Sequence, residues 1–153
     1  MQLYTLVYLI KDHQILLAMK KRGRGEGFWN GAGGKPEPGE TIEQAMIREC
    51  QEEIGVTPLE YEKVSIQDWG FTDGKSDGQC HTYLCSQWQG EPTESEEMAP
   101  QWFDISQIPY DKMWPSDRIC LPLMLNGQKG RVELTIKDNN AIAAAKFDFT
   151  EQL

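Results

Sequence analysis

The chain has 153 residues, of which 39% are hydrophobic and 25% are charged, and its formal net charge is −9. A chain of this length can bury a core without disulfides and corresponds to one ordinary domain, which we expect to span residues 1–153. The negative charge argues against broad electrostatic binding to nucleic acid or to an anionic membrane, and no apolar run approaches the roughly 18 residues that cross a bilayer.

The first predicted elements form a hairpin. Residues 3–10 are rich in β-branched, aromatic and aliphatic side chains and predict a strand, and residues 15–19 predict the returning strand. The first strand carries few charged side chains, which is typical of a strand that is buried on both faces.

A basic run at residues 20–25 and a glycine-rich segment at residues 28–35 follow the hairpin. The basic run precedes an acidic pattern, so Lys20 and Arg22 are candidates for attracting phosphate groups, although such a run can equally be a solvated strand end. Asn30 has both an amide donor and an acceptor, which suits it to read the edge of a base; a structural role in a turn is the alternative.

A loop and a helix at residues 34–56 carry the strongest pattern of the chain. The loop contains prolines and glycines, which do not suit a helix interior. Thr41 and Gln44 have the spacing of a capping box, which predicts that a helix begins after Thr41. Nothing interrupts the helix over residues 42–54, and Gly55 is the expected stop.

Three glutamates near the end of this helix, Glu49, Glu52 and Glu53, are spaced so that they project from one face. Carboxylates at this spacing repel one another, and a divalent cation such as Mg²⁺, which prefers oxygen ligands, would turn that repulsion into binding. Arg48, four residues before Glu52, can steady one carboxylate. A solvated acidic surface is the alternative that the glutamates alone would favour.

The middle of the chain reads as β-structure. Strands are predicted at residues 61–69 and 80–88, with a turn-rich loop at residues 72–79 between them, and a short strand is predicted at residues 101–103. The acidic stretch at residues 90–100 contains four glutamates. One of them can reach the metal site as a further ligand or base, and the residue pattern does not choose which.

The last part of the chain predicts one helix and two strands. Ser116 or Asp117 can cap a helix that continues to about residue 125, and a tryptophan placed like Trp114, just before it, usually belongs to the core. Residues 131–136 alternate like an edge strand. Residues 141–149 are ambiguous, and we favour a strand that pairs with the preceding one.

The four cysteines, Cys50, Cys80, Cys85 and Cys120, have no spacing typical of a zinc site. We interpret them as free reduced thiols, as in a cytoplasmic protein, and no secretory signal is recognisable at the N-terminus. The sequence is compatible with a monomer or a homodimer.

The segment at residues 34–56 fits a longer pattern, Gly-x5-Glu-x7-Arg-Glu-U-x-Glu-Glu-x-Gly-U, in which U is a bulky aliphatic residue. Only Cys50, at the first U position, departs mildly. This pattern is the Nudix box, so the chain resembles a Nudix hydrolase. The matching positions are Gly34, Glu40, Arg48, Glu49, Glu52, Glu53, Gly55 and Val56.

Stretches both outside the box and at its start, within residues 3–125, are similar to the MutT-like branch that hydrolyses oxidised purine nucleoside triphosphates such as 8-oxo-dGTP. These stretches are residues 3–7, 19–23, 29–31, 33–35, 39–43, 97–98, 102–103, 107–109 and 113–115. The resemblance implies an α/β fold, the Nudix α/β/α sandwich with a mixed central β-sheet. It also implies hydrolysis to nucleoside monophosphate and pyrophosphate, for nucleotide-pool sanitisation.

The resemblance also implies roles for individual residues. Mg²⁺, with Mn²⁺ as a substitute, would be held by the Gly33 carbonyl, Glu49, Glu52, Glu53 and Glu97. The catalytic group would comprise Glu53, Glu49, Arg48 and Glu97, without fixing which glutamate is the base. The base pocket would comprise Thr5, Lys20, Asn30, Trp69, Phe71, Trp114 and Asp117, and we add Arg22 and Lys35 as further candidates for substrate binding.

Two departures from that branch concern the base pocket. The branch has two consecutive aspartates after Trp-Pro, both in contact with the purine, where this chain has Ser116 and Asp117. Arg24 and Ala32 stand where the branch has phenylalanines.

Three alternative functions use the same box or fold. They are removal of pyrophosphate from the 5′ end of RNA, hydrolysis of nucleotide sugars or dinucleoside polyphosphates, and nucleotide sensing without hydrolysis. The acidic net charge argues against an RNA substrate, and the intact set of glutamates argues against a sensor.

Overall fold

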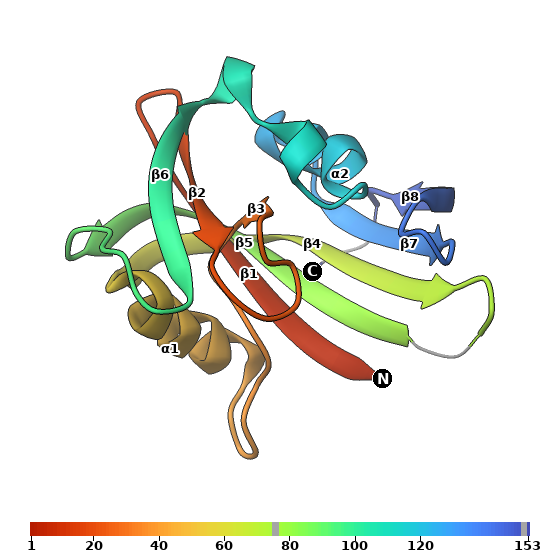
Figure 1. The fold of residues 1–153 in the computed structure, drawn as a ribbon, viewed down its shortest axis with the longest axis horizontal. Coiled ribbons are helices and arrows are strands. Elements are labelled where there is room, and N and C mark those ends of the chain that lie inside the picture. Colours follow the sequence, from red (N-terminus) through yellow and green to blue (C-terminus); the bar gives the residue numbers. More distant parts are fainter. Residues whose placement is uncertain (75–76, 151–152) are drawn as a thin grey trace.

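A computed structural model describes residues 1–74, 77–150 and 153 of the chain. These residues form a mixed sheet with one α-helix on each side (Figure 1). Neither described helix has the length and apolar character needed to cross a lipid bilayer. The elements are β1 (Gln2–Lys11), β2 (Gln14–Lys20), β3 (Trp29–Asn30), α1 (Ile42–Ile54), β4 (Thr57–Phe71), β5 (Asp77–Gln89), β6 (Met98–Asp104), α2 (Asp117–Leu125), β7 (Gly130–Ile136) and β8 (Ile142–Asp148), with short 3₁₀ turns at Ile105–Gln107 and Tyr110–Lys112.

The strand order of the sheet is β3-β2-β1-β5-β4-β7-β8, and β6 pairs with β2. The pairs β1·β5 and β4·β7 are parallel, and the other pairs are antiparallel, so the sheet is mixed as expected. The predicted hairpin of β1 and β2 is confirmed, with Ile10 paired to Ile15. β1 therefore lies in the interior of the sheet.

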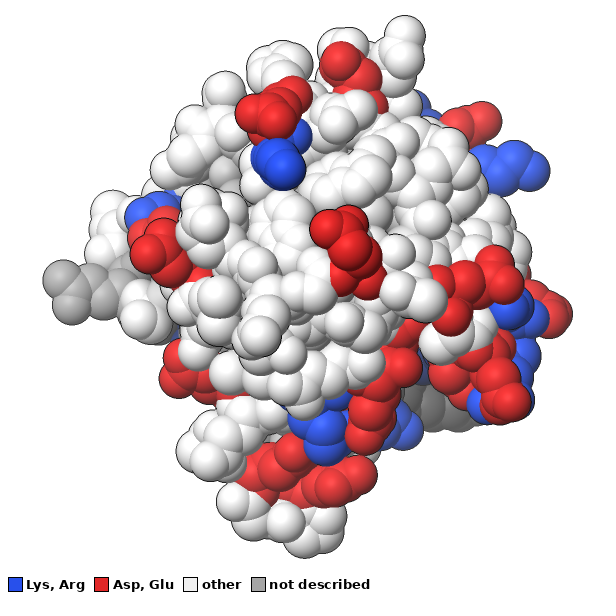
Figure 2. Space-filling view, turned by 90° about the vertical axis from the view of Figure 1, so that its left-hand side faces the viewer, with Lys and Arg blue, Asp and Glu red and all other residues white. Residues whose placement is uncertain are grey.

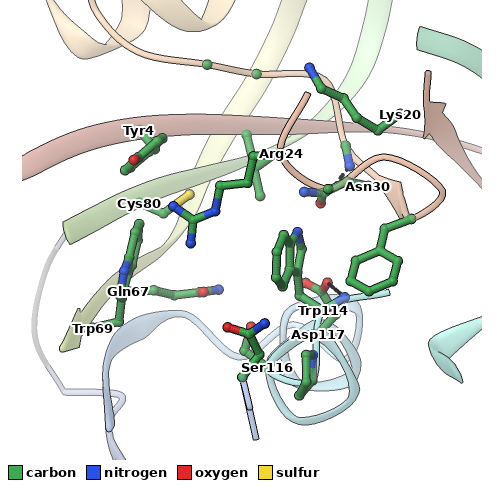
Figure 3. Close-up of a pocket in the computed structure, with 18 of the residues that line it drawn as sticks. Tyr4, Lys20, Arg24, Asn30, Gln67, Trp69, Cys80, Trp114, Ser116 and Asp117 are labelled. Atoms are coloured by element: carbon green, nitrogen blue, oxygen red, sulfur yellow. Dashed lines mark hydrogen bonds between the residues drawn. The ribbon is translucent and has the colours of Figure 1, made fainter. Parts of the chain in front are cut away.

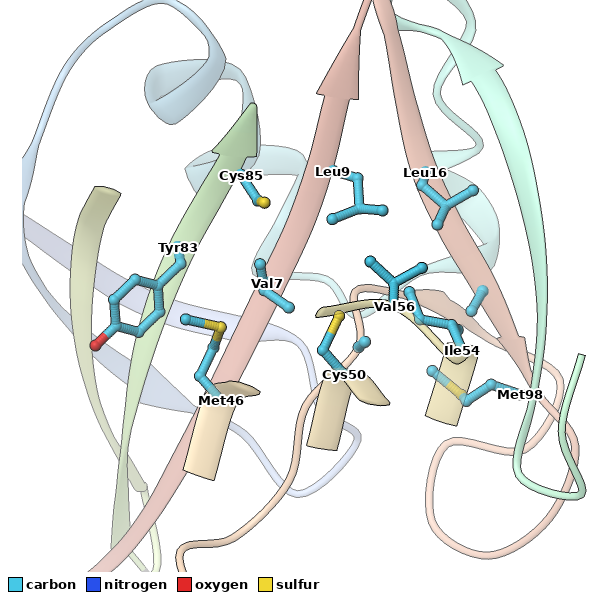
Figure 4. Close-up of a cluster of buried hydrophobic side chains, with 12 residues drawn as sticks. Val7, Leu9, Leu16, Met46, Cys50, Ile54, Val56, Tyr83, Cys85 and Met98 are labelled. Carbon is cyan, nitrogen blue, oxygen red and sulfur yellow. The ribbon is translucent and has the colours of Figure 1, made fainter. Parts of the chain in front are cut away.

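The two faces of β1 pack against different helices. Val7 and Leu9 belong to the cluster that includes Met46 of α1, which Figure 4 shows in detail. Tyr8, between them, belongs to the cluster that includes Leu121 of α2. Because side chains alternate along a strand, this arrangement confirms an α/β/α sandwich and a first strand that is buried on both faces.

Helix α1 begins and ends where the sequence predicts. The Thr41 hydroxyl accepts a hydrogen bond from the Gln44 backbone N–H at 3.1 Å, and the Gln44 side chain accepts one from the Thr41 N–H at 3.0 Å. Gly55 ends the helix with a φ of 71°, a conformation that favours glycine. The four cysteines are buried free thiols, as predicted.

Four predictions need correction. Residues 131–136 are not an edge strand, because β7 pairs with both β4 and β8. The loop predicted at residues 72–79 ends earlier, since β5 begins at Asp77; residues 75–76 lie outside the described residues. The strand predicted at residues 101–103 is the middle of the longer β6. Neither Ser116 nor Asp117 caps α2 in the expected way: Ser116 makes no capping bond, and the Asp117 carboxylate accepts from the Trp114 N–H.

The capping box makes a direct prediction about stability. Thr41→Ala removes the hydroxyl acceptor at the helix start and should lower the free energy of unfolding by about 1 kcal/mol. Thr41→Ser keeps the acceptor and should change it little. Urea unfolding of the three proteins measures both effects, and equal stabilities for the alanine and serine variants would contradict the role of the cap.

Candidate active site

One pocket of about 390 Å³ lies on the α2 side of the sheet. Its size is that of a small-molecule site. The floor is formed by alternate side chains of five strands, which face the same side because strand side chains alternate. The floor residues are Tyr4 and Leu6 of β1, Gln67, Trp69 and Phe71 of β4, Cys80 of β5, Leu134 and Ile136 of β7, and Ile142 of β8.

Two tryptophans stand at the walls of the pocket (Figure 3). Trp114 is half-buried, and the Phe28 ring meets it edge-on, with ring centroids 5.0 Å apart. Trp69 lies 5.3 Å from the Tyr4 ring, and a side chain at Gly78 would come within 2.4 Å of Trp69, so the glycine makes room for the indole. The core position favoured for a generic tryptophan was therefore wrong for Trp114.

Asn30 presents its amide nitrogen to the pocket. Its side-chain oxygen accepts hydrogen bonds from the Gly31 N–H at 2.9 Å and from the Tyr8 hydroxyl at 3.2 Å. Because both donors occupy the oxygen, the NH₂ group is the part left for a ligand. Asn30 can therefore have both predicted roles: its oxygen stabilises the local structure, and its NH₂ group can bind a ligand.

Asp117 is a buried carboxyl in the wall of the pocket, only 8% exposed. Burial raises its pKa to about 7, and the 3.1 Å hydrogen bond from the Trp114 N–H opposes this shift. The Tyr8 hydroxyl has a pKa well above its ordinary value because of burial and, second, the nearby Asp117. Near neutral pH, Asp117 can therefore either accept or donate a hydrogen bond from its carboxyl.

The glutamate end of the pocket begins at Glu53, which is 5% exposed and accepts a hydrogen bond from the Gly33 N–H at 3.3 Å. Burial and the adjacent Glu49 carboxylate raise the pKa of Glu53 to about 8. The carbonyls of Ala32 and Gly34 bond to β1. The Gly33 N–H, between these two residues, points toward Glu53 instead of β1.

Close packing against backbone requires glycine at position 33, whereas a side chain at position 34 would displace the end of the Glu49 side chain. A Cβ at Gly33 would lie 1.8 Å from the Thr5 carbonyl oxygen, and a Cβ at Gly34 would lie 2.6 Å from the Glu49 carboxyl group. Thr5 is fully buried, and its hydroxyl lies 3.4 Å from both the N and the O of Gly34.

Arg48 holds the loop and the helix together. Its guanidinium forms a two-point pair with Glu40, at 2.7 and 2.9 Å. It also contacts Glu49 at 3.0 Å and Glu52 at 3.2 Å, and donates to the Lys35 carbonyl at 3.1 Å. The Arg48 guanidinium lowers the pKa of Glu40 to about 2, and these carboxylates raise the pKa of Arg48. Arg48 thus holds Glu49 in position. It also makes the contact with Glu52 that the sequence spacing predicted.

Glu97 is joined to the basic run. Its carboxylate contacts Lys20 at 3.0 Å and Arg22 at 2.7 Å, and these two cations lower its pKa. Lys20 lines the pocket, and its charge lowers the pKa of Glu53. Glu97 is thus connected to the pocket by its ion pair with Lys20. Arg22 contacts Glu96 and Glu97 but does not line the pocket.

The acidic group has donors that suit a divalent cation. Among the described residues, no three His, Cys, Asp or Glu side chains are already gathered at metal-binding separation, because Arg48 engages Glu49 and Glu52 and Lys20 engages Glu97. The buried Glu53, however, faces Glu49 with its negative charge poorly compensated. A bound cation would supply that compensation, and the oxygen donors fit Mg²⁺.

The pocket brings most of the predicted substrate-binding residues together. The residues of the prediction that line it are Thr5, Lys20, Asn30, Lys35, Trp69, Phe71, Trp114 and Asp117, together with Gly33 and Glu53. Arg22, Arg48, Glu49, Glu52 and Glu97 do not line it. The sequence interpretation missed Tyr4, Phe28, Gln67, Cys80, Leu134, Ile136, Asn140 and Ile142; the alternation of side chains along β1, β4, β5 and β7 was the available signal for the strand residues.

With this geometry established, comparison with known proteins decides the family. The sequence pattern of the NUDIX domain matches residues 2–124. The chain belongs to the Nudix family.

Nudix relatives match nearly the whole chain. It is 41% identical to the oxidized purine nucleoside triphosphate hydrolase of Danio rerio, over 99% of this chain and 97% of the relative. The oxidized purine nucleoside triphosphate hydrolase of Mus musculus is also 41% identical, over 92% of this chain and 90% of the relative. The crystal structure of a MutT protein from Bacillus halodurans superposes with a TM-score of 0.86 at 25% identity, covering 99% of this chain and all of that chain.

The buried Asp117 of this Nudix protein predicts a pH-dependent stability. Its pKa is about 7 in the folded protein, against 3.8 as the ordinary value, so the folded state binds more protons between these pH values and loses stability as pH rises. Asp117→Asn cannot titrate and can still accept from the Trp114 N–H. The free energy of unfolding of the Asp117→Asn variant, relative to that of the parent, should rise by up to roughly 4 kcal/mol between about pH 4 and pH 8.

Urea unfolding of both proteins across this pH range tests the prediction. Other groups titrate alike in the two proteins, so their contributions cancel in the difference. A stability difference that is independent of pH would contradict the raised pKa.

Proposed function

We propose that this Nudix hydrolase cleaves purine nucleoside triphosphates, including oxidised ones such as 8-oxo-dGTP, to nucleoside monophosphate and pyrophosphate. The observation that carries the proposal is the continuity of one pocket. The same pocket is lined by Asn30, Trp114 and Asp117 and by Gly33 and Glu53. A nucleotide whose base lies between the tryptophans would bring its phosphates to the glutamates. The names of the 41% identical relatives support this substrate class.

The phosphate end would use both cations and carboxylates. Lys20 and Lys35 line the pocket and would attract the triphosphate. The residues that would hold Mg²⁺, or Mn²⁺ in its place, are Glu49, Glu52, Glu53, Glu97 and the Gly33 carbonyl. When bound, the ion neutralises phosphate charge and polarises water.

In the reaction, the oxygen of a water molecule forms a bond to phosphorus and a bridging P–O bond breaks, so that pyrophosphate leaves. The water must lose a proton. Glu53 is the member of the acidic group that lines the pocket, so we assign it the role of accepting that proton. Arg48 would act as a positioning residue, because its guanidinium fixes Glu49 and Glu52.

The base end would hold a purine by stacking and by polar groups on its edge. Trp69 and Trp114 offer flat apolar surfaces, and Asn30 and Asp117 offer a donor and an acceptor. We further propose that the chain works as a single domain over residues 1–153, as a monomer or a homodimer, in the cytoplasm, where its buried thiols stay reduced.

The substrate class can be tested with a panel of 8-oxo-dGTP, dGTP and a 5′-triphosphorylated RNA. We expect kcat/KM to be highest for a nucleoside triphosphate, because a long polyanion needs a basic track. On the face shown in Figure 2, basic side chains lie beside acidic ones and form no continuous track. Faster cleavage of the RNA would overturn the substrate assignment.

The role of the glutamates can be tested with Glu53→Gln. This variant keeps the shape of the side chain and removes the carboxylate, so hydrolysis should fall by about 10²- to 10⁴-fold. Glu60→Gln, at an exposed position of β4, is the matched control and should retain full activity. Circular dichroism verifies that both variants fold, and an unchanged rate for folded Glu53→Gln would remove Glu53 from the mechanism.

A further inference from the structure

Arg24 is the cation of the basic run that the acidic stretch at residues 90–100 does not neutralise. Lys20 and Arg22 pair with Glu97, and Lys21 pairs with Glu94 at 3.2 Å. Within the described ranges of the chain, Arg24 has no carboxylate partner and no hydrogen bond to its guanidinium. It lines the pocket instead.

The backbone around Arg24 is held in a fixed turn. Gly23, Gly25 and Gly27 all have φ between 78° and 87°, which glycine adopts without strain. The turn is closed by hydrogen bonds from the Gly27 N–H to the Lys20 carbonyl at 2.9 Å and from the Phe28 N–H to the Gly25 carbonyl at 2.9 Å. Gly25 also packs against Trp114, since a Cβ there would lie 3.4 Å from the indole.

This turn places the guanidinium against the aromatic wall. The Arg24 guanidinium carbon lies 5.7 Å from the centre of the Trp114 ring. In Figure 3, the side chain of Arg24 points into the space between Trp69 and Trp114. A guanidinium has five N–H donors in a planar fork and no acceptor, and it stays charged at any physiological pH. A base that enters this space therefore meets the guanidinium donors at its edge.

We propose, building on the proposed function, that Arg24 is a specificity-determining residue that favours 6-oxopurine over 6-aminopurine nucleoside triphosphates. Its fork donates hydrogen bonds to the carbonyl oxygen at C6 of a guanine-type base. An adenine-type base presents an amino group there, and donor would face donor.

Asp117, the other ionisable group at the base, cannot by itself distinguish a guanine-type base from an adenine-type base. As a carboxylate, Asp117 accepts from the N1–H and 2-amino groups of a guanine-type base, but by taking up a proton it can donate to the N1 acceptor of an adenine-type base. Arg24 has no second protonation state to use. A donor that cannot switch rejects the wrong hydrogen-bond pattern more strongly than a group that can.

The test compares kcat/KM for 6-oxopurines (8-oxo-dGTP, dGTP, dITP) and 6-aminopurines (dATP, 2-hydroxy-dATP) in the parent, Arg24→Met and Arg24→Lys. Methionine keeps an apolar stem on Trp114 and removes the donors. The ratio of 6-oxo to 6-amino kcat/KM should fall about 10-fold in Arg24→Met, mainly through KM, and less in Arg24→Lys. Lys21→Met, which removes a charge from the same run outside the pocket, should leave the ratio unchanged.

Calorimetric binding of dGMP and dAMP gives a readout that needs no turnover. The preference for dGMP should likewise fall about 10-fold in Arg24→Met. An unchanged ratio in both experiments would overturn the proposal, as would an equal loss for every substrate, which would indicate a phosphate contact. If the parent hydrolysed no purine triphosphate, the proposed function would fail, and the monophosphate ratios would still decide the role of Arg24.

Discussion

The backbone of Gly33 approaches β1 so closely that a side chain has no room, and hydrogen bonds of Gly33 and Gly34 connect β1 to α1. The Thr5 N–H donates to the Gly34 carbonyl at 2.8 Å, and the Gly33 N–H donates to Glu53. A Cβ at either glycine would overlap Thr5 or Glu49. The strand that supplies the floor of the pocket and the helix that supplies its carboxylates are therefore held in one arrangement by the same two residues.

Charge distribution separates the outer carboxylates of this arrangement from the inner one. Arg48 divides its guanidinium between Glu40, Glu49 and Glu52, and the cations of the basic run take up Glu97. Glu53 is the carboxylate that these pairs do not reach directly, and it is also the buried one that lines the pocket. The fold thus neutralises the outer carboxylates and leaves the inner one, among the described residues, without an ion pair of its own.

The sequence predicted structural features that depend on neighbouring residues better than features that depend on contacts between distant parts of the chain. The bounds of α1 were predicted to the residue because the capping box and Gly55 are local signals. The expected pairing of residues 131–136 with the following strand is confirmed, but their expected edge position was wrong because β7 also pairs with β4, which is distant in the sequence. The Nudix box identified the glutamates, but Asn140 and Ile142 of the C-terminal hairpin lack any local chemical pattern that would assign them to the pocket.

Of the three departures from the family resemblance, Ala32 lies in the buried cluster beside α1 and not in the pocket, whereas Ser116 and Arg24 both line the pocket and change its charge in the same direction. Ser116 replaces an acid and Arg24 replaces an aromatic residue, so the pocket has one negative charge fewer and one positive charge more than the branch pattern has. With an acid at position 116, the pocket would contain an added carboxylate that could compete for the Arg24 guanidinium. Because Ser116 is uncharged, the donors of Arg24 stay available to a ligand, and Asp117 is the single carboxyl of the Ser116–Asp117 pair that can accept from a base. In the proposed recognition of the base, the change at position 116 therefore makes a cation at position 24 useful, and the two substitutions act together on specificity.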